Sequence, residues 1–230
     1  MSLNVSLIPV ITIDGPSGTG KGTLAALIAK KLGWHLLDSG ALYRAVAWAI
    51  LHSGITLGDA LALQHLLASL TIEMRATNPT ETPRIYCDSQ DITALIRDEA
   101  VGMMASKSSA LPMVRAAVLI PQRNFRKAPG LVADGRDMGT VVFPDATLKL
   151  YLDADPLERA SRRFQQLQAR GVAISFEEVK KDLYKRDQQD AGRDIAPLKP
   201  ARDAQRIDTT GLSIEETFAN AMAYVQQFVL

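Results

Sequence analysis

Near its N-terminus the chain reads Asp14-Gly15-Pro16-Ser17-Gly18-Thr19-Gly20-Lys21-Gly22-Thr23, and this stretch indicates more about the fold than any other. The residues before it, Pro9–Ile13, are apolar and β-branched and predict a buried strand. The residues after it, Leu24–Gly33, are apolar at helical spacing and end in cations and a glycine, which predicts a helix. A strand, a glycine-rich turn and a helix in this order are the setting of a phosphate-binding loop.

The residues of the turn suit a nucleotide phosphate. Glycines let consecutive backbone N–H groups turn inward around phosphate oxygens, and the helix N-terminus adds a partial positive charge. Lys21 can then reach the β- and γ-phosphates. Ser or Thr usually follows this lysine, and its hydroxyl binds Mg²⁺. Here Gly22 follows the lysine instead, and Thr23 comes one residue later. We therefore expect Thr23 near the α-phosphate, and Mg²⁺ held by phosphates and water with no direct protein ligand. A turn that binds nothing is the alternative, and both flanks disfavour it.

Composition excludes several classes of protein. Hydrophobic residues make up 47% and charged residues 22% of the 230 residues, which argues against disorder. The net charge of +1 opposes a general nucleic-acid or membrane binder. Cys87 is the only cysteine, so an intrachain disulfide is excluded and a reducing compartment is favoured. No apolar run approaches the roughly 18 residues of a membrane helix, and no signal-peptide pattern is present, so we expect a cytoplasmic protein.

Strands and helices alternate along most of the chain. Further strands are predicted at 34–38, 130–134, 147–152 and 204–208, and further helices at about 41–51 and from a capping box at Ser213 and Glu216 onward. Alternation of this kind predicts an α/β fold, a five-stranded parallel sheet with helices on both faces.

One range breaks the alternation. Residues from about 57 to 109 contain a helix-like stretch and two short strands around a turn-rich segment with Asn78, Pro79 and Pro83. They predict a small sheet-and-helix insertion. We expect a single domain, 1–230, divided into a core of 8–56 and 110–230, an insertion of about 57–109 and a lid of about 156–193.

Arginines follow the predicted strands, where ligands of open parallel sheets bind. Arg44 follows the second strand, in the expected first turn of a helix, where the helix dipole disfavours a cation unless an anion is near. It predicts a phosphate contact, with a salt bridge to a neighbouring carboxylate as the alternative. Arg136 and Asp137 follow the third strand and suit a ligand with phosphate and hydrogen-bond donors. Their alternative is a turn neutralised by its own ion pair.

A third group of cations lies on a predicted helix that begins at Asp155 and Pro156. Arg159, Arg162 and Arg163 fall at i, i+3 and i+4 and therefore share one face. Residues 156–206 contain 12 Lys and Arg against 8 Asp and Glu. Because like charges destabilise a helix face, an anion from outside is favoured over a merely solvated face. The group predicts a lid that closes over phosphates.

These features together favour phosphoryl transfer, which requires positioning and charge neutralisation. The sequence offers no metal-ligand cluster and no Ser/His/Asp arrangement. A hydroxyl acceptor would benefit from a carboxylate base, whereas a phosphate acceptor is already anionic and needs none. The excess of arginine therefore favours a phosphate as the acceptor.

The chain resembles the bacterial cytidylate kinases from about Ile8 to Phe228. Three segments carry the resemblance, 14–23, 37–44 and 133–146, together with the spacing of Arg186, Asp187, Asp190 and Arg193. The first segment is shared by many kinases, and the second and third together are specific to this family. The resemblance implies transfer of the ATP γ-phosphate to CMP or dCMP in pyrimidine metabolism, with Mg²⁺ and as a monomer. It implies no nucleic-acid or membrane partner.

The resemblance also implies roles for individual residues. Lys21, Arg136, Arg159 and Arg163 would be catalytic. ATP would be bound by Arg159 and the loop residues Gly15, Pro16, Ser17, Gly18, Thr19, Gly20, Lys21, Gly22 and Thr23. Arg44, Arg136 and Arg193 would bind the CMP phosphate, and Ser106, Arg115 and Asp137 would read the cytosine edge. Ser39 would help seat the nucleotide, and Arg186 and Asp190 would contact the ribose. The insertion resembles the CMP-binding subdomain of the family, and the helix with Arg159 resembles its short lid.

Three other functions compete with this one. A kinase of the same fold with another acceptor would need a carboxylate base, for which Asp38 is the candidate. A GTPase-type switch would use Asp208-Thr209-Thr210-Gly211 as a D-x-x-G motif, but this motif lies far from its usual place and no Asn-Lys-x-Asp motif is present. A nonenzymatic ATP-binding regulator is the third, and turnover would distinguish it.

Overall fold

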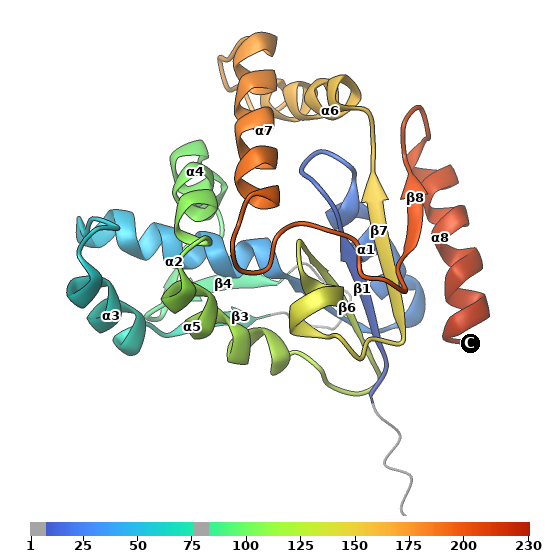
Figure 1. The fold of residues 1–230 in the computed structure, drawn as a ribbon, viewed down its shortest axis with the longest axis horizontal. Coiled ribbons are helices and arrows are strands. Elements are labelled where there is room, and N and C mark those ends of the chain that lie inside the picture. The colour runs from blue at the N-terminus through green and yellow to red at the C-terminus, as the bar shows by residue number, and fades with distance from the viewer. Residues whose placement is uncertain (1–7, 76–82) are drawn as a thin grey trace, which may run out of the picture.

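The structure, a computed structural model, describes residues 8–75 and 83–230. Five parallel strands form the central sheet in the order β2-β6-β1-β7-β8 (Figure 1). The strands are β1 Val10–Asp14, β2 His35–Asp38, β6 Leu131–Gly135, β7 Leu148–Asp153 and β8 Gln205–Asp208. All of β1 is buried, as expected for the central strand of a sheet covered on both faces. The predicted five-stranded parallel α/β fold is confirmed.

Helices cover both faces of the sheet. On one face α1 (Lys21–Leu32) packs against α8 (Ile214–Phe228), and their apolar side chains form one core with β1, β6 and β7. On the other face α2 (Ser39–Ser53) and α5 (Pro112–Arg123) build a second core around residues such as Leu37 and Phe143. The sheet is therefore buried on both sides, and only its edges and ends are available for a ligand.

The starts of the helices follow from capping residues. Ser213 and Glu216 form the predicted capping box of α8. Asp38 ends β2 and also caps α2, since its Oδ1 accepts from the Ala41 N–H at 3.1 Å. The helix consequently begins at Ser39, without a loop, and Arg44 lies in its second turn. The prediction of a first-turn position for Arg44 was wrong.

The range 57–109 holds more structure than the sequence indicated. It contains α3 Ala60–Ser69, β3 Ile72–Arg75, β4 Arg84–Cys87, β5 Gln90–Asp91, the 3₁₀ turn η1 Leu95–Arg97 and α4 Glu99–Ser108. The two predicted strands pair antiparallel, and β5 adds a third strand too short to give a pattern in the sequence. Asn78 and Pro79 lie outside the described residues. The division into core, insertion and lid remains a prediction.

Two helices, α6 (Pro156–Gln168) and α7 (Phe176–Ala191), stand beyond the carboxyl ends of the strands, at the top of Figure 1. They pack through a small apolar cluster of their own, formed by Ala160, Leu167, Val179 and Leu183. A short π-helical turn, η2 (Met138–Val142), follows β6. In the ranges that the structure describes, no helix is both long enough and apolar enough to cross a membrane.

Candidate active site

The loop between β1 and α1 has the backbone of a phosphate cradle. Gly15, Gly18 and Gly20 have φ of +146°, +83° and +87°, which a residue with a side chain rarely adopts. Gly20 is the N-cap of α1, and no side chain in the described ranges caps this helix. The first N–H groups of α1 are therefore left for an anion.

Gly15→Ala is expected to destabilise the fold, because a Cβ there would lie 2.0 Å from the Leu152 carbonyl oxygen. We expect a loss of about 3 kcal/mol or more in the free energy of unfolding, measured by urea denaturation. Gly20→Ala is the matched control, since its Cβ would meet no described atom within 4 Å. Strained φ alone should cost that variant about 1 kcal/mol. Equal losses in the two variants would contradict the proposed clash.

Lys21 begins α1 and is only 6% exposed. Its Nζ donates to the Pro16 carbonyl oxygen at 2.7 Å, across the mouth of the loop. Burial, and after it the nearby Arg136, lower the pKa of Lys21 to about 7. A buried ammonium group in such surroundings is stabilised by a polyanion, which favours phosphate binding at this point.

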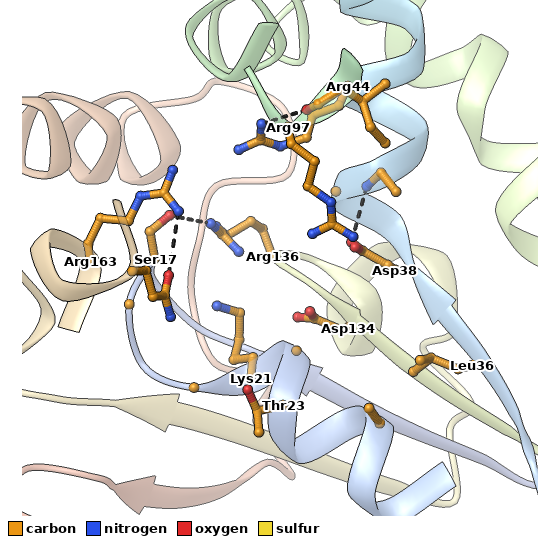
Figure 2. Close-up of a pocket in the computed structure, with 18 of the residues that line it drawn as sticks. Ser17, Lys21, Thr23, Leu36, Asp38, Arg44, Arg97, Asp134, Arg136 and Arg163 are labelled. Atoms are coloured by element: carbon orange, nitrogen blue, oxygen red, sulfur yellow. Dashed lines mark hydrogen bonds between the residues drawn. The ribbon is translucent and has the colours of Figure 1, made fainter. Parts of the chain in front are cut away.

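A cavity of about 590 Å³ opens above the loop. Figure 2 shows Lys21, Arg136 and Arg163 pointing into it, with Asp134 beside Lys21. Its lining includes seven cations, namely Lys21, Arg44, Arg97, Arg136, Arg163, Arg170 and Arg186. Only two carboxylates, Asp38 and Asp134, line it among the described residues. A cavity of this size and charge suits a polyphosphate ligand.

A recess of about 140 Å³ adjoins this cavity and shares Arg44, Arg136 and Arg186 with it. Eight of the nine side chains predicted to bind the acceptor line the recess. They are Ser39, Arg44, Ser106, Arg136, Asp137, Arg186, Asp190 and Arg193. The tertiary structure thus brings together residues of α2, α4 and α7 with residues that follow β6 and α7. Ser39 and Arg193, the most distant pair, lie 154 positions apart in the sequence.

The ninth residue, Arg115, lies behind the recess and not in its lining as described. Its guanidinium forms a buried ion pair with Asp137, donates to the Ser109 carbonyl and lies over the ring of Tyr43. Burial raises the pKa of Asp137 above its ordinary value, although Arg115 acts in the opposite direction. Arg115 therefore orients Asp137, and a direct contact with the ligand is not what this arrangement favours.

Arg136 and Asp137 do not neutralise each other. Arg136 Nε donates to Asp190 Oδ2 at 2.9 Å, and its NH2 group donates to Ser17 Oγ at 2.7 Å in the loop (Figure 2). Asp190 also pairs with Arg193, whose NH2 group reaches Ser109 Oγ at 2.9 Å. Arg136 consequently connects the loop to α7, between the cavity and the recess. The alternative of a self-neutralised turn is wrong.

The three arginines of α6 have carboxylate partners. Arg159 pairs with Asp187 at 2.7 Å and donates to the Ser17 carbonyl at 3.1 Å, while Arg163 pairs with Glu99. Arg162 is not in the described lining of the 590 Å³ cavity. Its guanidinium binds Glu158, and it donates to the Thr209 carbonyl at 2.7 Å. The prediction that all three arginines share one face over the phosphates was wrong for Arg162, which joins α6 to the loop after β8.

The sequence of the chain matches that of a known protein family. Residues 11–227 match the family model described as "Cytidylate kinase". The chain belongs to the cytidylate kinase family. The cytidylate kinase of Coxiella burnetii is 55% identical over 219 residues, which cover 95% of this chain and 92% of that protein. The cytidylate kinase of Aeromonas hydrophila is 50% identical over 221 residues, 96% of this chain and 95% of that protein.

A solved gluconokinase from Sinorhizobium meliloti 1021 also matches 96% of this cytidylate kinase family chain and 93% of its own chain. It is 13% identical, with a TM-score of 0.48, and at that level the likeness says nothing of the reaction.

Asp134 also belongs to this site, although it was not among the residues predicted to form it. It is the penultimate residue of β6, beside Lys21, and it lines both the cavity and the recess (Figure 2). Burial raises its pKa to about 6, against the nearby Lys21. Among the described residues none donates to its Oδ1, although that atom is buried. Its place at the carboxyl end of a strand, two residues before Arg136, was the signal that could have found it.

A further cavity, of about 420 Å³, lies on the other side of the loop, between α6 and the start of α8. Its lining includes Thr23, Gln165, Gln166, Leu212 and Ile214. Mixed apolar and amide side chains of this kind suit a nucleoside. The loop thus lies between a place for a nucleoside and the cationic cavity.

The structure disfavours two competing functions, the GTPase-type switch and the kinase with a hydroxyl acceptor. Asp208 Oδ1 accepts from the Thr210 N–H at 2.9 Å and from Thr210 Oγ1 at 2.6 Å, so the D-x-x-G match is a local turn. Asp38 Oδ1 is engaged as the cap of α2, which disfavours Asp38 as a general base for a hydroxyl acceptor.

Proposed function

We propose that this protein transfers the γ-phosphoryl group of ATP to the phosphate of CMP or dCMP, forming CDP or dCDP and ADP. One observation carries the proposal: a phosphate loop and an acceptor recess are joined by Arg136, which binds Ser17 on one side and Asp190 on the other. Arg136 therefore lies where the donor and acceptor phosphates would meet. Membership of the cytidylate kinase family supports the choice of substrates.

The donor would lie along the loop, with its phosphates on the free N–H groups of α1 and beside Lys21. Its nucleoside would occupy the cavity between α6 and α8 near Thr23. Arg159, held by Asp187 and the Ser17 carbonyl, would then border the phosphates from the lid side. These contacts act through positioning and charge, which is what phosphoryl transfer requires.

Mg²⁺ would come with ATP. We propose that the ion is held mainly by phosphates and water. Asp134 also fits Mg²⁺, because its buried Oδ1 has no partner in the described chain. This oxygen would accept a hydrogen bond from a water molecule in the hydration shell of Mg²⁺. When bound, Mg²⁺ would neutralise charge on the transferring phosphate.

The acceptor phosphate would be bound by Arg44, Arg136 and Arg193 and would attack as an anion without a base. Arg44 has no carboxylate within ion-pair distance in the part of the chain that the structure describes, and it donates to the Ile96 carbonyl at 2.9 Å. Burial, followed by the charge of Arg186, lowers the pKa of Arg44 to about 10. An anion bound there would relieve both costs.

The experiment that tests this function measures ADP release from ATP and Mg²⁺ with CMP, dCMP, UMP, AMP or no acceptor. We expect turnover with CMP and dCMP far above the other three. Comparable turnover with UMP would leave a kinase but remove the proposed specificity. If no acceptor raised ADP release, the protein would not be this kinase. We also propose that it acts in the cytoplasm, and that it acts as a monomer, as the family resemblance implies. Light scattering with CMP and ATP present tests the oligomeric state.

Asp137→Asn is expected to reduce the preference for CMP over UMP by about 100-fold in kcat/KM. Asp137 is 2% exposed and oriented by Arg115, so its carboxylate can accept from the cytosine amino group but faces a carbonyl oxygen in uracil. Kinetics with both nucleotides measure the effect. Asp145→Asn is the control, because Asp145 also pairs with an arginine, Arg126, but lies outside the recess. Equal losses for CMP and UMP would contradict the role.

A further inference from the structure

Glu99 joins three elements that are far apart in the sequence. It is the first residue of α4, in the insertion, and its two carboxylate oxygens bind different lid helices. One oxygen binds Arg163 of α6, and the other accepts from Arg186 of α7 at 2.8 Å. The side chains of Arg163 and Arg186 are 16% and 11% exposed, so both pairs are shielded from water more than a surface salt bridge is.

Both arginines line the large cavity, whereas Glu99 is absent from the described residues that line it or the recess. Glu99 therefore holds the two guanidinium groups from behind the cavity wall. Each arginine uses its NH2 group for Glu99 and retains other N–H donors. Arg186 Nε is buried and has no partner in the described chain, and Arg163 NH1 reaches only Gln166 Oε1, at 3.5 Å.

The cations around Glu99 repel one another. A Cβ on Gly102 would lie 3.1 Å from both terminal nitrogens of Arg44 and 3.3 Å from the NH2 group of Arg186, so both guanidinium groups lie against the same point of α4. Glu99 is the carboxylate that binds Arg163 and Arg186 in this crowded region. Without it, each guanidinium would keep its charge but lose the partner that fixes its orientation.

We propose that Glu99 is a positioning residue that orients Arg163 toward the donor phosphates and Arg186 toward the acceptor nucleotide by tying α4 to α6 and α7. This inference rests on the proposed kinase function for its ligand, and it adds a residue outside the binding set. The arginines are set correctly only when the insertion and the two lid helices lie together. Glu99 thereby couples the place of the acceptor to the place of the donor.

A double-mutant cycle tests the inference. Glu99→Ala should lower kcat/KM for CMP by about ten-fold in the parent protein, and by less than two-fold in the Arg163→Ala/Arg186→Ala background, where nothing remains to be oriented. Equal losses in both backgrounds, or no loss in the parent, would overturn it. Glu177→Ala is the control, since Glu177 is an exposed carboxylate of α7 that pairs with Lys180 at 3.5 Å, and neither residue lines the two cavities or the recess as described, so kcat/KM should stay unchanged.

Two further measurements keep the outcome unambiguous. Glu99→Gln keeps the size of the side chain and removes its charge, so it replaces Glu99→Ala if thermal unfolding shows a loss of fold. Binding of inorganic tripolyphosphate, measured by calorimetry, needs no turnover and should weaken with Glu99→Ala in the parent only. A parent protein without CMP-dependent turnover would refute the proposed function, and this binding cycle would still support or overturn the role of Glu99.

Discussion

Lys21→Met is expected to lower kcat by about a thousand-fold while the protein stays folded. Lys21 is the cation at the first turn of α1, and methionine has a similar length without the charge that would meet the β- and γ-phosphates. Removal of the ammonium group should leave the fold intact, because burial already disfavours this charge and lowers the pKa of Lys21 to about 7. Steady-state kinetics at saturating ATP and CMP measure the change. Lys31→Met, on the exposed end of the same helix, is the control.

The same variant gives a second signal, in proton uptake. In the ligand-free protein the pKa of Lys21 is about 7, so the side chain is mostly neutral at pH 8. Bound polyphosphate favours the charged form, so ATP binding at pH 8 should take up close to one proton, and binding at pH 6 should take up almost none. Calorimetry in buffers of different ionisation enthalpy counts the protons. Uptake that persists in Lys21→Met would assign the proton to another group and contradict the role of Lys21.

Arg136→Ala is expected to lower kcat by about a thousand-fold to ten-thousand-fold, which lies within the thousand-fold to hundred-thousand-fold contribution of an arginine that neutralises a transferring phosphate. Arg136 binds Ser17 in the loop and Asp190 at the recess, so its guanidinium lies between the two proposed phosphates. Asp190 keeps its pair with Arg193 in the variant, which limits the damage to the fold. Rapid-quench measurement of the chemical step tests this.

Two controls isolate the charge and geometry of Arg136. Arg126→Ala removes an ion pair with Asp145 and a donor to the Ile8 carbonyl, away from the cavity, and should leave kcat near the parent value. Arg136→Lys keeps the charge but not the fork of donors, so it should recover little of the lost activity. A full recovery of kcat with lysine would mean that charge alone is needed, and it would contradict a role for the two-sided hydrogen bonding of Arg136.

Much of the fold could be predicted because its signals are local. The apolar runs, the glycine loop and caps such as Ser213 lie within a few residues of the element they specify, so the five strands were predicted nearly at their true bounds. The strand order was not predictable in this way, because the pairing of β1 with β6 joins residues about 120 positions apart. The two-residue strand β5 and the helix α4 were missed, since neither has a strong pattern of its own.

The candidate site was predictable to a similar degree. Arg44, Arg136 and Asp137 follow strands, and position along a parallel sheet is enough to bring them to one end. By itself, therefore, the sequence determined the phosphate loop, the cationic character of the site and the family.

Only the tertiary structure decided which cation faces which partner. Arg162 turns away from the cavity, Arg115 lies behind Asp137, and Glu99 binds arginines 64 and 87 positions further along the chain. The physical reason is range. Helical and strand patterns report each residue's own neighbourhood, whereas the orientation of a guanidinium depends on carboxylates and carbonyl groups brought near it by the packing of other elements.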